Sequence, residues 1–260
     1  MNLQLGRNIY GLAAIVYGVI TLFWHQINSL GNISNPEILV FIIGVVEIIG
    51  GLTLQWQKTL RIGALTLIAV HFIFLFYLVP FIYEMPLDYS NWGNFFQEFS
   101  IVLGSLIVFV SNIQSDTEKR IKISRAAYTC YGICVFSYSL YQLFYLSYTA
   151  GLVPKWIPPG QMFWAVTTSV AFALAAVAIL SGRSALLASR LLTSMFICFC
   201  LLVWLPASII NPYDLSNWYG NADTLAVAGS AWIVADLLSQ QKIILLQLPF
   251  GRIRTERKEV

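Results

Sequence analysis

Residues 62–80 read IGALTLIAVHFIFLFYLVP, a run without a single Asp, Glu, Lys or Arg. At the 1.5 Å rise of an α-helix, about 20 apolar residues cross the hydrocarbon core of a bilayer. This run is therefore predicted to be a transmembrane helix. Comparable runs lie on both sides of it, and the complete set of predicted spans is 8–25, 37–55, 62–80, 95–112, 126–147, 161–181, 188–208 and 222–240.

The composition excludes a water-facing surface over most of the chain. Hydrophobic residues make up 58% of the sequence and charged residues 10%, against about 25% charged residues in a soluble globular domain. Walker loops, Cys/His zinc spacings and Gly-x-Ser-x-Gly elbows are absent from the sequence, which disfavours ATP-driven pumps and hydrolases. We predict an all-α integral membrane protein of eight transmembrane helices, with the lipid bilayer as its main partner.

The basic residues fall on one side of the predicted membrane. With eight spans both termini share a side, and every Lys and Arg except Lys155 lies on that side, in a loop, in a tail or at the end of a span. Because cytoplasmic loops are enriched in Lys and Arg, both termini are predicted to be cytoplasmic. These cations flank the spans, where lipid headgroups explain them, so the net charge of +3 does not predict nucleic-acid binding.

The sequence repeats itself at a spacing of 121 to 126 residues. Tyr10 and Tyr17 match Tyr131 and Tyr138 at an offset of 121. At an offset of 126, the residues Pro80, Pro86, Asp88, Ser90, Asn91 and Trp92 match Pro206, Pro212, Asp214, Ser216, Asn217 and Trp218.

Each repeat holds four predicted spans, an even number, so the copies are expected to lie parallel as two four-helix bundles. The repeat divides the chain into a first unit (1–114), a charged cytoplasmic linker (115–125), a second unit (126–240) and a basic cytoplasmic tail (241–260). The repeated Asp-x-Ser-Asn-Trp loops are expected to cap helix starts and to anchor Trp at the interface, with an outer-face docking role as the alternative.

Two short motifs, one in each half, carry a family resemblance. GVVEIIGGL at residues 44–52 combines glycines with a glutamate on the second span, and VPKWIPP at residues 153–159 is a proline-rich outer loop. Both resemble segments of the DoxX-like four-helix membrane proteins, which include the small subunit of a thiosulfate:quinone oxidoreductase. The resemblance implies a tandem pair of DoxX-like units in a bacterial inner membrane, linked to quinone redox chemistry and to a soluble or membrane redox partner.

Glu47 and His71 are the deepest ionisable residues of the predicted spans. An ionisable side chain inside a bilayer costs about 2.5–3.5 kcal/mol, which makes each one a functional candidate. They lie roughly 15 Å and 12 Å from the outer ends of their spans, at depths where they could meet. Such a pair can share a proton or bind a quinone carbonyl or hydroxyl.

Glu47 and His71 are therefore the candidate catalytic residues, and with Tyr17 they are the candidate cofactor-binding residues. The alternative is that Glu47 is neutral and only clamps helices together through a hydrogen bond. A haem held by His25 and His71 is disfavoured, because the two residues differ by about 12 Å in depth. No metal site is predicted.

The second half lacks counterparts of Glu47 and His71, so a proton-active site is expected in the first unit alone. Glu98 and Asp223 fall near the outer starts of their spans, where the helix dipole favours an anion, and no special role is expected of them.

These patterns predict a redox-associated, quinone-linked membrane subunit with a ligand or proton site in the first bundle. A small-solute or ion carrier is the alternative, because duplicated membrane proteins bind substrate between their halves. A non-catalytic scaffold for a partner protein is a third hypothesis.

Overall fold

The computed structural model describes residues 4–27, 37–113 and 117–247, and the regular elements in these ranges are helices. They are α1 (Gln4–Trp24), α2 (Glu37–Gln55), α3 (Leu60–Glu84), α4 (Tyr89–Asn112), α5 (Thr117–Phe144), α6 (Leu146–Leu152), α7 (Gln161–Ser181), α8 (Ala185–Phe199), a π-helical turn (Cys200–Trp204), α9 (Leu205–Ile210) and α10 (Leu215–Gln247). Among the described residues, seven helices are long and apolar enough to cross a membrane: α1, α2, α3, α4, α7, the continuous segment Ala185–Ile210 and α10. The chain is thus a multi-pass helical membrane protein.

The predicted span 126–147 is not among the seven. Its residues form most of α5, a helix of 28 residues, but repeated Tyr and Ser side chains lower the hydropathy of this segment. α5 packs between α4 and α7, so protein rather than lipid covers much of it. Seven of the eight predicted spans correspond to helices long and apolar enough to cross a membrane, and the eighth stays a prediction.

The segment expected to be a charged linker is largely helical. Residues 117–125 form the first turns of α5, and residues 114–116 lie outside the described residues. An ion pair of 2.6 Å joins Lys122 Nζ to Glu118 Oε1 one turn apart, a spacing that stabilises exposed helices. The predicted tail also begins as helix, because α10 continues to Gln247.

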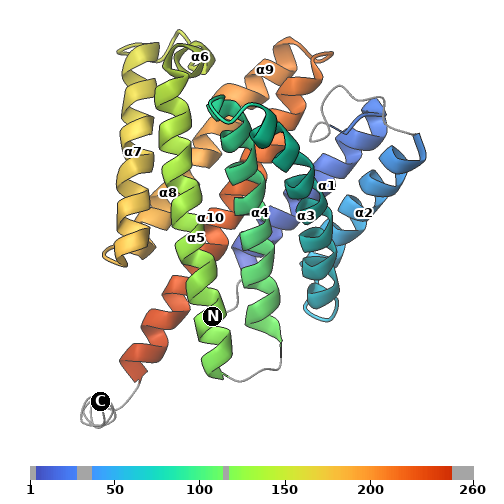
Figure 1. The fold of residues 1–260 in the computed structure, drawn as a ribbon, viewed down its shortest axis with the longest axis vertical. Coiled ribbons are helices and arrows are strands. Elements are labelled where there is room, and N and C mark those ends of the chain that lie inside the picture. Colours follow the sequence, from blue (N-terminus) through green and yellow to red (C-terminus); the bar gives the residue numbers. More distant parts are fainter. Residues whose placement is uncertain (1–3, 28–36, 114–116, 248–260) are drawn as a thin grey trace.

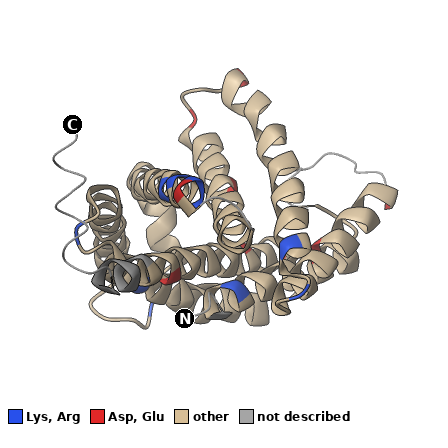
Figure 2. Ribbon diagram, turned by 90° about the horizontal axis from the view of Figure 1, so that it is seen from below, with Lys and Arg blue, Asp and Glu red and all other residues tan. Residues whose placement is uncertain are grey.

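The long helices stand side by side, so the molecule has two ends (Figure 1). We call the end that carries Gln4 and Gln247 the terminal face, and the end with the α3–α4 and α9–α10 turns the distal face. The turns between α2 and α3 and between α7 and α8, which carry Lys58 and Arg183, lie at the terminal face, and Arg61 follows at the start of α3. Viewed from that face, charged positions are few along the ribbons (Figure 2).

Helices α1 to α4 pack as successive neighbours, and α5, α7, α8 and α10 do the same. The two groups meet where α1 packs on α10, α5 packs on α4, and α4 crosses α10. Gly104 of α4 permits the last contact, because a Cβ at this position would lie 2.5 Å from the hydroxyl oxygen of Ser230. Two helices of the first group, α1 and α4, therefore pack against α10 of the second group.

The two distal turns share one hydrogen-bond pattern at an offset of 126 residues. Backbone N–H groups of Ser90 and Ser216 donate to Asp88 Oδ1 and Asp214 Oδ1, both at 3.0 Å. The indoles of Trp92 and Trp218 donate to the carbonyls of Pro86 and Pro212, also both at 3.0 Å. The expected capping role of these loops is confirmed, since each Asp caps the helix that follows it.

Candidate functional site

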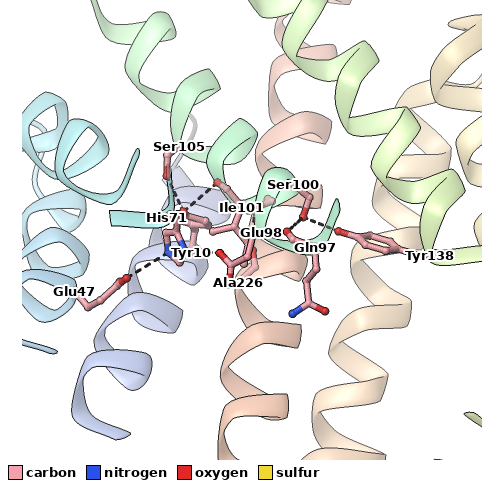
Figure 3. Close-up of polar contacts among 11 residues, drawn as sticks. Tyr10, Glu47, His71, Gln97, Glu98, Ser100, Ile101, Ser105, Tyr138 and Ala226 are labelled. Carbon is pink, nitrogen blue, oxygen red and sulfur yellow. Dashed lines mark hydrogen bonds and ion pairs between the residues drawn. The ribbon is translucent and has the colours of Figure 1, made fainter. Parts of the chain in front are cut away.

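His71 lies between two carboxyl groups in the interior of the first four helices (Figure 3). Its Nδ1 is 2.9 Å from Glu98 Oε2, and its Nε2 is 3.5 Å from Glu47 Oε1. The three residues come from α3, α4 and α2, and their exposed fractions are 4%, 5% and 0%. The predicted meeting of Glu47 and His71 is thus present, with Glu98 as an additional partner.

Close packing of α1 on α2 encloses Glu47. Gly18 of α1 lies against the backbone carbonyl of Gly44 and against the side chains of Glu47 and Ile48. A larger residue at position 18 would force the two backbones apart, and small residues are what membrane helices use to approach this closely. The glycines around Glu47 therefore close the site on the α1 side.

Neither carboxyl oxygen of Glu47 has a hydrogen-bond partner among the described residues. The 3.5 Å separation from His71 is an ion-pair distance, longer than the usual 2.7–3.2 Å of a hydrogen bond with nitrogen. The alternative role of Glu47, a clamp hydrogen-bonded to a neighbouring helix, is not what the structure shows. A carboxyl buried in this way is free to accept or donate one further bond.

Asp223 of α10 is the fourth ionisable group of the site. It lines the same cavity as His71, interacts electrostatically with Glu98 and His71, and is hydrogen-bonded to Gln97. The expectation of a site built by the first unit alone was wrong on this point, and so was the expectation that Glu98 and Asp223 serve only as helix starts. Both lie about two turns inside their helices, too deep for that role.

One signal in the sequence could have identified Asp223. At the offset of 126 residues that relates the distal turns, Gln97 corresponds to Asp223. Equivalent residues near the crossing of α4 and α10 are brought together, as Gly104 and Ser230 also are. Gln97 and Asp223 meet because α4 and α10 cross, and sequence analysis did not predict that these two helices cross.

Two tyrosines of α1 border the cluster. The ring of Tyr17 lies 6.4 Å from that of His71 and 4.9 Å from that of Tyr219, between centroids. The hydroxyl of Tyr10 donates to the carbonyl of Ile101 at 3.1 Å and accepts a 2.7 Å hydrogen bond from Ser105. The predicted candidate Tyr17 therefore belongs to the site, as part of its aromatic wall.

The cavity at the centre of the site is small. It is lined by Tyr10, Ala13, Ala14, Tyr17, His71, Ile101, Asp223 and Ala226, and the space open to the centre of a water-sized sphere is about 10 Å³. A volume of roughly 10–15 Å³ by this measure holds about one water molecule. In this conformation the cavity accommodates one water molecule or a hydronium ion. A quinone ring would fit only if the cavity widened.

No Lys or Arg balances the carboxyl groups. The sequence has no Lys or Arg between residues 8 and 57, 62 and 118, or 191 and 241, which covers the parts of the helices that build the site. Three carboxylates and one imidazolium would still leave a net negative charge inside a membrane, at high energetic cost. The cluster must therefore hold protons on its carboxyl groups.

The corresponding region of the second group is filled by aromatic rings. Tyr138, the match of Tyr17, packs its ring 5.7 Å from that of Phe172 and 6.0 Å from that of Phe196. Its hydroxyl donates to Ser100 at 2.6 Å, which ties the two groups together. Ionisable chemistry is therefore concentrated on one side of the α4–α10 crossing.

Among the described residues, no group of three or more His, Cys, Asp or Glu side chains is arranged to hold a metal ion. His25 lies beyond the last residue of α1, whereas His71 lies in the middle of α3. Comparison with known proteins found no matching family model, no matching curated protein and no matching solved structure.

Proposed function

We propose that this protein takes up and releases protons at the cluster of Glu47, His71, Glu98 and Asp223. The observation that carries the proposal is the burial of two carboxyl groups and an imidazole next to a third, half-buried carboxyl group, without a neighbouring Lys or Arg. A cluster of this kind can accept a proton at one group and pass it to the next, because the acid and base groups already lie side by side.

Two protonation states fit the geometry around His71. A neutral imidazole that donates from Nδ1 to Glu98 presents a lone pair on Nε2 to a protonated Glu47. An imidazolium instead faces two carboxylates. The two states differ by the position of one proton between Nε2 and Oε1, which lie 3.5 Å apart. Arrival or loss of a proton at Asp223 would shift the balance between them.

For the architecture, we propose eight spans in two parallel, DoxX-like four-helix bundles, with cytoplasmic termini in a bacterial inner membrane. The matched hydrogen bonds of the distal turns support an internal duplication. The equivalent packing order of the two groups of helices supports the bundles. Lys and Arg at the terminal face support the orientation, because such residues favour the cytoplasmic side.

Proton-coupled transport of a small solute or ion is the process that the geometry favours. Carriers with duplicated architecture bind substrate and coupling ions near the bilayer midplane, where their halves meet. Asp223 and His71 come from opposite halves and line one small cavity. Rearrangement at the α4–α10 crossing would open this cavity to one side or the other.

Quinone-linked redox chemistry is the second candidate, and Glu47 favours it. Its two carboxyl oxygens lack hydrogen-bond partners among the described residues, so they could bind a quinone carbonyl or hydroxyl. In that case the cluster would supply protons to a quinone as it is reduced by a partner protein. The DoxX-like resemblance of residues 44–52 supports the same proposal.

The test is proton flux in vesicles reconstituted with the purified protein and loaded with a pH-sensitive dye. Glu47→Gln and His71→Gln remove the two central bases, and Glu37→Gln is the matched control at the exposed start of the same α2 helix. Lipid extracts of the purified protein are analysed in parallel for quinones.

We expect wild type and Glu37→Gln to support proton flux, and the two cluster variants to lose it. Solute-dependent flux without bound quinone would favour the carrier, whereas a bound quinone lost in Glu47→Gln would favour the redox subunit. Equal behaviour of wild type and both cluster variants, with no flux and no ligand, would overturn the proposal and favour a scaffold.

A further inference from the structure

On the side of the cluster toward the terminal face, the crossing of α4 and α10 is tightly packed. Residues 101–105 of α4 and 226–231 of α10 are all buried. Gly104 contacts Ser230 so closely that no side chain fits between the two helices there, and Gly229 lies against the backbone of Tyr10. A proton at the cluster therefore has no open path between α4 and α10 toward the terminal face.

The other half of the same helix pair is polar and partly exposed. On α4, Asn94 is exposed and Gln97, one turn further on the same side of the helix, is half-buried. On α10, Asn221, Asp223 and Thr224 are half-buried. Carboxyl and amide groups that faced lipid at this depth would be costly, so their exposed surface is best satisfied by water.

Asp223 is the group that joins this polar half to the cluster. It is hydrogen-bonded to Gln97, interacts electrostatically with Glu98 and His71, and lines the small cavity with His71. Figure 3 shows Gln97 and Glu98 next to each other at the α4 side of the cluster, with His71 and Glu47 beyond them. The side chains thus form a continuous series from the partly exposed to the fully buried residues.

We infer that the cluster exchanges protons with the distal face, through Asp223, and is sealed from the terminal face in this conformation. A hydronium ion gives its proton to the Asp223 carboxylate, the proton passes across the cavity to His71, and His71 passes it to Glu47. Each step moves one proton between neighbouring bases and needs no oxidant or reductant. Gln97 holds the Asp223 carboxyl in place by its hydrogen bond. That the cluster is reached from the distal face follows from the packing of α4 on α10. That the ion exchanged is a proton rests on the proposed function.

The test is the reaction of single cysteines with a charged, membrane-impermeant thiol reagent in sealed vesicles of known orientation. The four native cysteines, Cys130, Cys134, Cys198 and Cys200, are first replaced by Ala. Single cysteines are then introduced by Gln97→Cys and Asp223→Cys. Ser105→Cys probes the sealed half, and Tyr213→Cys and Arg183→Cys report the exposed distal and terminal turns.

Gln97→Cys and Asp223→Cys should react from the same side as Tyr213→Cys, at least about tenfold faster than Ser105→Cys. Reaction from the side of Arg183→Cys, or rates as slow as that of Ser105→Cys, would overturn the inference. Variants that elute as aggregates are replaced by Thr224→Cys, which probes the same half of α10.

Proton flux separates this inference from the proposed function. Asp223→Asn retains the size of the side chain but cannot carry the proton, and we expect it to slow proton uptake from the distal face while Glu47 still protonates. If the cysteines at positions 97 and 223 react from the distal side but the protein shows no proton flux, the access route is supported and the proton function is refuted. Flux that is unaffected in Asp223→Asn would refute the role of Asp223 and keep the proton function.

Discussion

The two nitrogens of His71 face different carboxyl groups, and this gives the imidazole two distinct roles. The 2.9 Å contact with Glu98 fixes the orientation of the ring, as second partners of functional histidines commonly do. The longer contact with Glu47 leaves room for a proton or a ligand to move. The exchangeable proton is thus expected on the Glu47 side of the ring.

Glu47→Gln removes the acid that exchanges a proton with His71 Nε2 and keeps nearly the same volume. We expect proton flux to fall by about 100-fold or more, the size of effect typical of a general acid or base. The melting temperature in detergent should stay close to that of wild type, since neither oxygen of Glu47 is hydrogen-bonded within the described residues. A Glu37→Gln variant with the same loss of flux would contradict this assignment.

Depth arithmetic was sufficient to predict that Glu47 and His71 could meet, because both lie on helices with well-defined ends. It could not predict Asp223, whose position depends on α10 packing against α1 from the other half of the chain. Nor could it predict the role of Glu98, since the side of α4 that faces His71 depends on how the helices pack. Contacts between residues were therefore predicted correctly only where the depth of each residue in its span was enough to predict the contact.

The two distal turns are equivalent in their caps but differ in one contact. Asp88 Oδ1 also accepts a 2.6 Å hydrogen bond from the hydroxyl of Tyr145, and this bond holds the pKa of Asp88 below its ordinary value. No hydrogen bond from a tyrosine to Asp214 occurs in the described residues. Only the first turn is therefore tied to the end of α5.

Asp88→Asn should lower the melting temperature more than Asp214→Asn, which removes a cap without a tyrosine contact. Because the folded pKa of Asp88 is depressed, its contribution is complete above the unfolded pKa and is lost as pH falls through the folded pKa. The difference between the variants should thus be full at neutral pH and shrink in acid. Thermal melts of the two variants across pH measure this, and equal melting temperatures at neutral pH would refute the Tyr145 contact.

Gly104 controls the approach of α4 to α10. Gly104→Leu places a side chain where a Cβ would already lie 2.5 Å from Ser230 Oγ, and overpacking of this kind costs about 1–3 kcal/mol. Gly151→Leu is the control, since a Cβ there meets nothing within 4 Å. We expect a lower melting temperature for Gly104→Leu only, and equal stability of both variants would show that the helices do not approach as described.

Helix positions were well predicted where a long apolar run defines the helix. The predicted spans 37–55 and 161–181 coincide with α2 and α7, and both helices are strongly apolar. α5 was harder, because its charged first turns resembled a linker and its interior carries Tyr and Ser. Packing between α4 and α7, rather than hydropathy, determines that helix.

At the scale of the whole molecule, the number of spans decides where the termini lie. If α5 crosses the membrane with the seven apolar helices, both termini share one side, and Lys and Arg at the terminal face predict the cytoplasm. Protease-cleavable tags at each end, probed in right-side-out and inverted vesicles, test this. We expect both tags to be cut only in inverted vesicles, whereas tags on opposite sides would rule out eight spans.

The central claim, a buried cluster that holds exchangeable protons, is tested most directly by infrared spectroscopy of the purified protein as a function of pH. Protonated carboxylic acids absorb separately from carboxylates, so the protonation of the cluster can be observed without a transport assay. We expect a protonated-carboxyl band near neutral pH in wild type and Glu37→Gln, reduced in Glu47→Gln and Asp223→Asn. A wild-type protein whose carboxyl groups are all ionised at neutral pH, or a band unchanged in both cluster variants, would contradict the proposed site.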